Sequence, residues 1–433
     1  MNFHGGFLCA EGNFLFIGRR WKDANLGDRE LPSSQVRAVL VVFANSISDS
    51  PEAMNEVTRL LRDLVALPSL NPMGRSLPPD DIYEHRVTAY VEEFFRRLGV
   101  RYERQTIGPL RDNIIGYTDL PGARRTLLLE AHQDTVPTDN MTIDPFGGVI
   151  EKGRLYGRGA CDIKGGMAAM LSVFARVARE KPDRAANLVM ACTVDEEHTF
   201  LGVQRLVQRP PQVDMAVVAE PTQLQIVNAH KGVCRWYVTT RGRACHSSRP
   251  EQGTNAIYQM ARLLTAIERY ADSLRAARTD ALLGPATISV GRIEGGTSAN
   301  TVPDRCRIEI DRRMLPGEDP LQAPRELSSY LTQFARDGSF ECSEPWLRSP
   351  ALGPEKSTDL VNRLGQAIDS VTGSHEVTVV PYGTDASTIA EAGIPAVVFG
   401  PGDIAKAHTA DESVPLDEVE AAAEILYRFA CSA

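Results

Sequence analysis

Short apolar segments alternate with amphipathic helical patterns along this 433-residue chain, and this alternation restricts the fold more than any other feature. Residues 127–129, 187–194, 214–219 and 396–400 are such segments. A strand that is apolar on both faces needs cover on both faces, and parallel sheets obtain it from the helices that connect their strands. The sequence therefore predicts a doubly wound α/β layer structure.

A second pattern interrupts the first between residues 229 and 341. Outside this interval, helices are expected over residues 54–65, 87–98, 164–179 and 357–371 and from Asp417 onward, and strands over residues 101–104, 113–117, 127–129, 187–194, 214–219, 376–380 and 396–400. Inside it, strand, helix, strand, strand and helix are expected over residues 233–240, 255–270, 287–293, 306–314 and 321–334. The latter order is typical of a compact α+β, ferredoxin-like domain with its helices on one face of an antiparallel sheet.

The predicted domains follow from this change. We expect an N-terminal extension of unknown role over residues 1–50, a main domain over residues 51–228 and 342–433, and an inserted smaller domain over residues 229–341.

Charge and cysteine content exclude several classes of protein. The 47 Lys and Arg residues against 56 Asp and Glu give a net charge of −9, and the basic residues form no stripe that could bind nucleic acid. No apolar run approaches the ~20 residues of a membrane-spanning helix, and the N-terminus does not resemble a secretory signal, so we expect a cytoplasmic protein. The eight cysteines are dispersed without a CxxC pair, which predicts reduced thiols.

Acidic and histidine side chains follow the predicted strands where these strands end. The residues concerned are His132, Asp134, Asp195, Glu196, Glu197, Glu220, His408 beyond the strand at 396–400, and Asp162 in a glycine-rich loop before a helix. In open α/β sheets ligands bind outside the carboxyl ends of the strands, so we expect these side chains to converge on one crevice. Imidazole and carboxylate donors suit divalent zinc, and a carboxylate shared between two ions permits a dinuclear site.

Each of these residues also has an ordinary structural interpretation. A single His408 or Asp162 at a strand end or in a loop is more often a cap or a surface group. The acidic run at 195–197 is more often a solvated turn. Their joint occurrence at strand ends and in glycine-rich loops favours the metal site, where a carboxylate beside a ligand can accept a proton from water.

In their order along the chain, these blocks resemble those of the dinuclear zinc amidohydrolases and exopeptidases. That family includes acetylornithine deacetylase, succinyl-diaminopimelate desuccinylase, aminoacylase and bacterial glutamate carboxypeptidase. Five separated blocks match between about residue 52 and the C-terminus, and residues 1–50 lie outside the resemblance. The resemblance implies that the main domain is catalytic and that the inserted domain is a lid and dimerisation domain.

The resemblance also implies a ligand set. One metal ion would be held by His132, Asp162 and Glu220, and the other by Asp162, Glu197 and His408. Asp162 would be the bridging carboxylate, followed by a cis peptide bond. The implied cofactors are two divalent metal ions per chain, zinc in the first place, with cobalt and manganese left open.

Two acidic residues have other roles by this resemblance. Asp134 would fix the orientation of the His132 imidazole, as carboxylates commonly do for zinc-bound histidines. Glu196 would be the general base that takes a proton from water and passes it to the leaving amine.

The inserted domain would contribute to the site of a homodimer. His246 would reach the active site of the partner subunit and stabilise the tetrahedral oxyanion. Asn300 and Arg313 would hold the substrate carboxylate, which a planar guanidinium grips in bidentate fashion. Arg312 and Arg313 alternate across a strand, so only one of them faces the cleft. Alignment with the family's block from Pro303 implies that it is Arg313.

Three further residues are candidates for contact with the substrate. These are Thr384, Asp385 and Lys231, whereas His230 is expected to be structural.

The function implied is hydrolysis of the amide bond of an N-acyl amino acid, in the manner of acetylornithine deacetylase. A desuccinylase of succinyl-diaminopimelate and an aminoacylase or dipeptidase-type carboxypeptidase are the enzymatic alternatives. A catalytically silent binding scaffold is the non-enzymatic one, and it would typically lack Glu196 or a ligand. The expected partners are a small N-acyl amino acid and a second copy of the chain, with no nucleic acid and no membrane.

Overall fold

The computed structural model describes residues 7–10, 13–16, 54–335 and 340–432. The chain divides into two units, residues 1–54 and residues 55–433. In the first unit, β1 (Phe7–Ala10) and β2 (Asn13–Phe16) form an antiparallel hairpin. Most of the predicted extension over residues 1–50 lies outside the described residues, and the candidate site belongs to the second unit.

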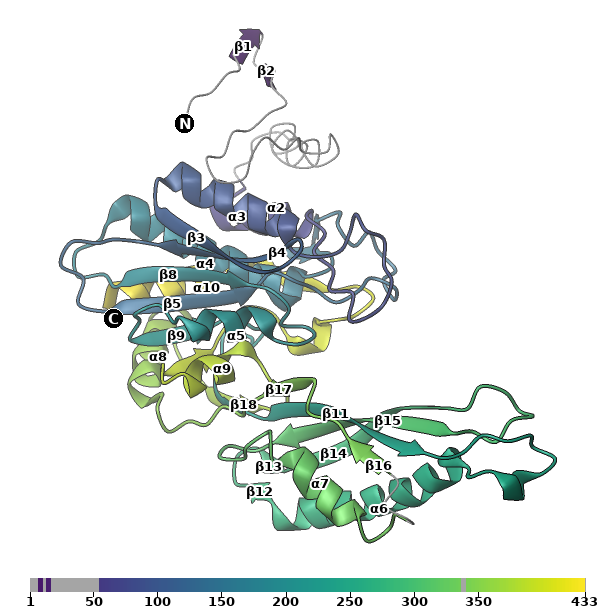
Figure 1. The fold of residues 1–433 in the computed structure, drawn as a ribbon. Helices are drawn as coiled ribbons and strands as arrows, with labels where there is room; N and C mark the ends of the chain where they lie inside the picture. The colour runs from purple at the N-terminus through teal and green to yellow at the C-terminus, as the bar shows by residue number, and fades with distance from the viewer. Residues whose placement is uncertain (1–6, 11–12, 17–53, 336–339, 433) are drawn as a thin grey trace. The chain divides into compact units, whose positions relative to one another are not determined.

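An eight-stranded sheet forms the centre of the main domain (Figure 1). In spatial order its strands are β18 (Val377–Val380), β10 (Ile226–His230), β19 (Ala396–Val398), β9 (Met215–Val218), β5 (Thr126–His132), β8 (Asn187–Thr193), β4 (Arg111–Tyr117) and β3 (Arg101–Gly108). The neighbours β19, β9, β5 and β8 run parallel. Their carboxyl ends therefore meet at one edge of the sheet, where a ligand site is expected.

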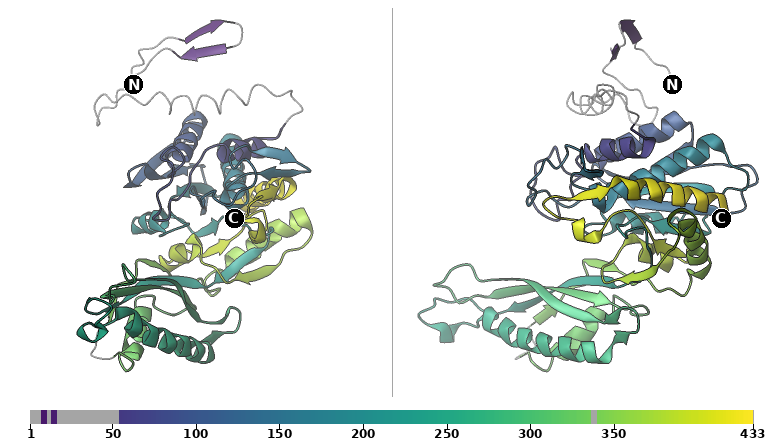
Figure 2. Two further views of the ribbon diagram at one scale, coloured as in Figure 1. Left: turned by 90° about the vertical axis from the view of Figure 1, so that its right-hand side faces the viewer. Right: turned by 180° about the vertical axis from the view of Figure 1, so that it is seen from behind.

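Helices cover both faces of this sheet (Figure 2). One group of mutually packed helices comprises α2 (Glu56–Val65), α3 (His85–Leu98), α4 (Gly165–Glu180), α8 (Thr358–Thr372) and α10 (Leu416–Ser432). On the other face, α5 (Leu201–Gln208) and α9 (Asp385–Glu391) share a core with alternate strand residues such as Leu128 and Val189. The predicted doubly wound α/β architecture is confirmed.

Local sequence signals explain the boundaries of the first helices. The side chain of Asn55 accepts a hydrogen bond from the Thr58 N–H at 2.9 Å and thereby caps the start of α2. Gly99 follows α3 in the left-handed conformation, with φ +67°, which a glycine adopts without a steric penalty. Both helices therefore begin or end where the chain supplies the appropriate capping residue.

The inserted domain is a five-stranded antiparallel sheet with two helices on one face. In chain order its main elements are β11 (Gly232–Arg241), α6 (Ala256–Ala277), β14 (Thr287–Gly295), β15 (Arg305–Met314), α7 (Ala323–Leu331) and β16 (Phe340–Cys342). The spatial order β14-β15-β11-β16 places the first strand between the third and the fourth, as in ferredoxin-like domains. The α+β prediction for this region is confirmed, although α6 is longer than expected because Leu274 continues its buried stripe.

Short strands complete both domains. β17 (Leu347–Ser349) also pairs with β11, and β12 (Thr279–Asp280) pairs with β13 (Gly284–Pro285). β6 (Val149–Glu151), β7 (Arg154–Tyr156) and β20 (Ser413–Pro415) form a three-stranded sheet. The pairing of β20 with β7 brings the segment after His408 next to the segment before Asp162.

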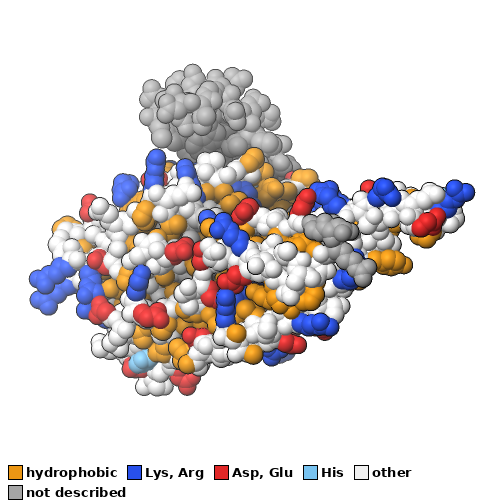
Figure 3. All heavy atoms as spheres, turned by 60° about the horizontal axis from the view of Figure 1, so that its bottom comes forward, with side chains coloured by type: hydrophobic (Ala, Val, Ile, Leu, Met, Phe, Trp, Pro, Cys, Tyr) orange, Lys and Arg blue, Asp and Glu red, His pale blue; other side chains and the backbone are white. Residues whose placement is uncertain are grey.

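The surface of the described residues is mixed in character. On the face drawn in Figure 3, basic side chains are scattered among acidic, neutral and apolar ones. Among the described residues, no helix is both long enough and apolar enough to span a membrane.

Candidate functional site

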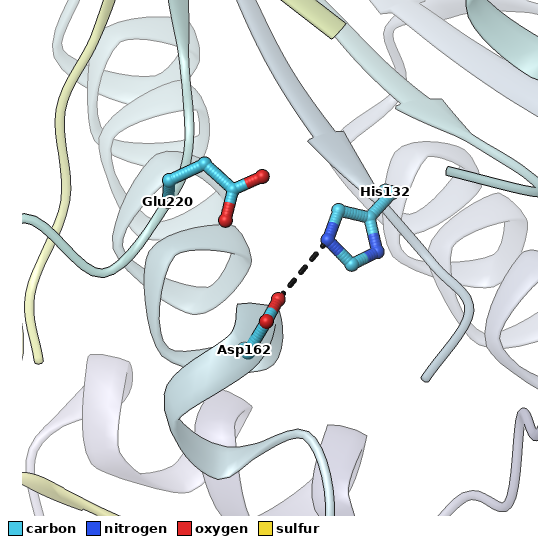
Figure 4. A group of neighbouring side chains, drawn as sticks. All are labelled: His132, Asp162 and Glu220. Atoms are coloured by element: carbon cyan, nitrogen blue, oxygen red, sulfur yellow. Dashed lines mark ion pairs between the residues drawn. The ribbon is translucent and has the colours of Figure 1, made fainter. Parts of the chain in front are cut away.

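Three side chains from separate elements meet beyond the carboxyl edge of the parallel strands. His132 is the last residue of β5, Glu220 follows β9, and Asp162 lies in the η1 turn (Ala160–Lys164) before α4. The three side chains point toward one another (Figure 4), and one potential ligand atom of each lies within 4.8 Å of the other two. Their exposed fractions are only 2 % for His132, 6 % for Asp162 and 5 % for Glu220. One imidazole and two carboxyls therefore form a buried group beyond this edge of the sheet.

Asp162 also belongs to a second group of the same kind. The Nε2 atom of His408 lies 3.2 Å from Oδ2 of Asp162 and 3.2 Å from Oε1 of Glu197. The His408 side chain is about half exposed, so this group faces solvent more than the first. The structure thus brings together all five residues that the family resemblance assigns as metal ligands, with Asp162 shared between the two groups.

The donor set fits a dinuclear metal centre. Nε2 of His132 and Oδ1 of Asp162 form a buried ion pair at 3.2 Å, and neither atom has a further hydrogen-bond partner among the described residues. Buried polar atoms are rarely left in that state unless another group pairs with them. Imidazole nitrogen and carboxylate oxygen are donors that zinc and related divalent ions accept. The peptide bond between Asp162 and Ile163 is cis, as the resemblance implies.

The electrostatics of the cluster favour added positive charge. Burial alone would lower the pKa of His408, but Asp162 and Glu197 raise it to about 11. Burial would raise the pKa of Asp162, but the two histidines outweigh burial and lower it. The pKa of Glu220 is raised well above its usual range, first by burial and then by the charge of Asp162. His408 and Glu220 therefore hold protons more strongly than usual, whereas Asp162 between the two histidines holds its proton less strongly.

Asp134 holds His132 in a different way from the one predicted. Nδ1 of His132 lies 2.9 Å from the backbone carbonyl oxygen of Asp134, whereas the nearest carboxylate oxygen of Asp134 is 3.7 Å away. The carboxylate instead accepts the backbone N–H groups of Glu196 and Glu197, each at 3.2 Å. Asp134 thus orients the imidazole through its backbone and holds the acidic turn through its side chain.

A further hydrogen-bond network, not predicted from the sequence, supports this turn. The side-chain amide of Asn71 donates to Asp134 at 2.8 Å and to Asp195 at 2.9 Å. The Arg111 guanidinium lies 2.8 Å from Asp195 and 2.5 Å from Glu84, and both acidic side chains are buried. Asn71 and Arg111 precede the acidic turn by more than 80 residues, so no local sequence signal connects them with it.

Glu196 is adjacent to the ligand groups without belonging to either of them. Burial raises the pKa of its carboxyl well above the usual range, the charge of His132 opposes this, and Glu220 reinforces it. These interactions place the Glu196 carboxyl beside the cluster. A carboxyl of raised proton affinity at this place is suited to accept a proton from water and to release it again.

His246 and Asn300 lie side by side in the inserted domain. The backbone N–H of Ser247 donates to the Asn300 carbonyl oxygen at 3.0 Å, and His246 pairs with Thr301 in an isolated bridge. Both His246 and Asn300 are exposed. Among the described residues, neither side chain makes a hydrogen bond to a residue of the ligand cluster of its own chain.

The alternation of β15 separates the two arginines that were candidates for a carboxylate clamp. Arg312 is 1 % exposed, lies on the face packed against the helices and pairs with Glu318 at 2.7 Å. Arg313 lies on the opposite face, is partly exposed and donates to Asp311 at 2.9 Å. Of the two, only Arg313 therefore lies on the face that the helices leave uncovered, and its role as a carboxylate clamp stays a prediction.

Thr384 is placed differently from its prediction as a substrate contact. It is fully buried, and its hydroxyl caps α9 by accepting the Ala386 N–H and lies 3.0 Å from Nε2 of His230. Asp385 is buried as well, 3.1 Å from the Thr193 hydroxyl. Lys231 donates to the carbonyl oxygen of Pro285. In this arrangement these groups are engaged in contacts within the protein.

Comparisons with known proteins identify the family and the fold of this chain. Residues 128–432 match the model of peptidase family M20/M25/M40. Acetylornithine deacetylase of Myxococcus xanthus is 32 % identical over 349 residues, which cover 78 % of this chain and 90 % of that protein. An M20 family metallo-carboxypeptidase from Sulfolobus solfataricus has a similar fold, with a TM-score of 0.70 at 20 % identity, covering 87 % of this chain and 99 % of that one. A dinuclear metal-binding M20 peptidase from Bacillus subtilis has a TM-score of 0.63 at 16 % identity, covering 87 % and 97 %.

Proposed function

This chain belongs to peptidase family M20/M25/M40 and is a metal-dependent hydrolase, and we propose that it cleaves the amide bond of an N-acyl amino acid. The observation that carries the proposal is the pair of ligand groups that share Asp162, with the free carboxyl of Glu196 beside them. The similarity to acetylornithine deacetylase favours a short acyl group on an amino acid as the substrate.

The proposed chemistry divides the work between the metal centre and the chain. Two divalent ions, zinc in our proposal, supply Lewis-acid polarisation of the amide carbonyl and make a water molecule easier to deprotonate. Glu196 removes a proton from the attacking water and returns it to the amide nitrogen, which then leaves as an amine. The Asp134 carboxylate keeps the Glu196 backbone in place during both transfers.

The substrate carboxylate is assigned to the inserted domain. Arg313 lies on the uncovered face of β15, where its guanidinium can exchange Asp311 for a carboxylate of the substrate. Asn300 is exposed beside His246 and is the second proposed contact. Since these groups and the metal ligands belong to different domains, closure of the domains around the substrate is part of the proposal.

We also propose a homodimer in which His246 acts in the site of the partner. Its imidazole is exposed, and it is not hydrogen-bonded to the ligand cluster of its own chain among the described residues. A donor that reaches the developing oxyanion from the other subunit would complete the site. A cytoplasmic location remains a prediction from the sequence.

The experiment that tests the function is amine release from a panel of substrates. The panel contains N-acetyl-ornithine, N-succinyl-diaminopimelate, other N-acyl amino acids and simple dipeptides, each assayed with zinc-loaded protein. A Glu196→Ala protein serves as the blank, because it retains the ligand groups. One strong signal that the blank lacks would support the proposal and identify the substrate class. A panel without any signal would contradict it, and a signal confined to dipeptides would favour a peptidase.

A further inference from the structure

Arg158 and Glu412 form an ion pair inside the protein. Nη1 of Arg158 lies 2.5 Å from Oε2 of Glu412, and the two side chains are 1 % and 0 % exposed. Removing two charges from water is costly, and an apolar pair of similar volume is often as stable or more stable. Stability alone is therefore a poor explanation for this pair, and its other contacts indicate a different role.

The second carboxylate oxygen of Glu412 holds the backbone of the shared metal ligand. Oε1 accepts the N–H of Cys161 at 3.0 Å and the N–H of Asp162 at 3.1 Å. Asp162 has φ −121° and ψ 87°, which is not a helical conformation, although the η1 turn surrounds it. Its N–H is thus fixed by the carboxylate of Glu412, and not by a regular helical hydrogen bond.

The other end of the ion pair leads to His408. Nη2 of Arg158 donates to the carbonyl oxygen of Pro137 and to Oδ1 of Asn140, each at 3.1 Å. The Asn140 amide then donates to the backbone carbonyl oxygen of His408 at 2.9 Å. A continuous path of hydrogen bonds therefore connects the N–H of Asp162 with the carbonyl of His408, through Glu412, Arg158 and Asn140.

Asp162 and His408 differ from His132 and Glu220 in how the fold supports them. His132 ends β5 and Glu220 follows β9, so the large sheet places both of them. Asp162 lies in a turn and His408 in a loop that follows β19, so the sheet does not place them directly. Polar partners that orient ligands commonly affect metal affinity 10–100-fold.

We infer that Arg158, Glu412 and Asn140 are positioning residues that set Asp162 and His408 relative to each other and thereby define the second ion site. That site consists of Asp162, Glu197 and His408. The inference rests on the dinuclear centre of the proposed function. It does not depend on which substrate the enzyme hydrolyses.

The test titrates metal-free full-length protein with Zn²⁺ by calorimetry and with Co²⁺ by visible absorption. Asn140 is exposed, so Asn140→Ala removes the link to His408 with little risk to folding. We expect this variant to bind the second ion about 10–100-fold more weakly, with an altered Co²⁺ spectrum and an unchanged first ion. Glu412→Gln removes the charge that pairs with Arg158, and we expect it to weaken both ions because Asp162 belongs to both groups.

Arg154→Met is the matched control. Arg154 donates to the side chain and the carbonyl of Ser413 at 3.1 and 3.0 Å, so it ties β7 to β20 in the same region without contacting a ligand. We expect it to bind both ions as the wild type does. A general loosening of this region would instead weaken metal binding in the control as well, and would overturn the inference.

The remaining outcomes are equally decisive. Asn140→Ala and Glu412→Gln are compared with the control at equal unfolding temperature. If both variants then bind both ions as the wild type does, the inference is overturned and the proposed function is left intact. If Glu412→Gln does not fold, the Asn140→Ala result decides by itself. Wild-type protein that binds fewer than two ions would contradict the dinuclear centre, and hence both the proposed function and the inference.

Discussion

The carboxylate of Asp134 is hydrogen-bonded to the backbone of Glu196, with Oδ1 accepting the Glu196 N–H at 3.2 Å. Oδ2 accepts the N–H of the next residue, Glu197, at the same distance. One side chain therefore fixes both the proposed general base and a proposed metal ligand. The backbone carbonyl of the same residue orients His132. Asp134 therefore connects the end of β5, at His132, with the acidic turn at residues 195–197.

Asp134→Asn should lower kcat by about 10–100-fold, the range typical of lost supporting hydrogen bonds around ligands. The amide nitrogen of Asn cannot accept an N–H, so one of the two backbone contacts of the turn is lost. The measurement is steady-state kinetics on the best substrate of the panel, with the unfolding temperature as a control for folding. Unchanged kcat would show that the turn keeps its geometry without this carboxylate.

Glu196 and His246 should complement each other between subunits. Under the homodimer proposal, Glu196→Gln and His246→Ala proteins are each inactive or nearly so. When the two variant proteins are mixed and their subunits exchange, half of the dimers are hybrids. Each hybrid has one intact site, so about a quarter of the wild-type activity should return. Activity that does not recover after confirmed subunit exchange would place His246 outside the partner's site.

Removing the metal ions should destabilise the protein. Without cations, the carboxyls of Asp162, Glu197 and Glu220 repel one another in a confined cluster. A ligand present at 100 times its Kd stabilises the folded state by about 2.7 kcal/mol, so chelation should lower Tm and added zinc should restore it. Glu220→Gln, measured by the same thermal scans, should respond less to zinc. An identical Tm with and without chelator would argue against tight metal binding.

His230 should make stability depend on acidity. Burial lowers the pKa of this histidine from 6.5 to about 4, so between these values the unfolded chain binds a proton that the folded chain does not. The stability contributed by the neutral imidazole is therefore complete above pH 6.5 and is lost as the pH falls toward 4, on the order of 3 kcal/mol in total. In urea unfolding between pH 6.5 and 4, His230→Gln should reduce the slope by about 1.4 kcal/mol per pH unit. A variant with the wild-type slope would contradict this.

The parts of the fold and site that the sequence revealed are those with local signals. The apolar run before His132 and the one before Glu220 predicted strands and, by the rule for parallel sheets, a shared edge. The strand β10 was not predicted, because Asn228 interrupts the apolar pattern of a five-residue segment. The helix α9 was not predicted either, because it is short and its buried residues include the polar Asp385 and Ser387.

Contacts between distant segments could not be predicted in the same way. Nothing in the local sequence shows that the Thr384 hydroxyl meets His230, or that the Asp134 carboxylate turns toward Glu196 and away from the imidazole. Both depend on how strands far apart in the chain are brought together. Family resemblance supplied the ligand set, whereas the supporting hydrogen bonds became visible only in the folded chain.

In our proposal, Glu196 transfers the proton at a two-ion centre that forms without the Glu196 side chain. The most direct measurement is single-turnover hydrolysis of the best panel substrate by wild-type and Glu196→Gln proteins, each shown to hold two metal ions per chain. We expect equal metal content and a rate lower by about 10²–10⁴-fold in the variant, the range for loss of a general base. Equal rates at equal metal content would contradict it.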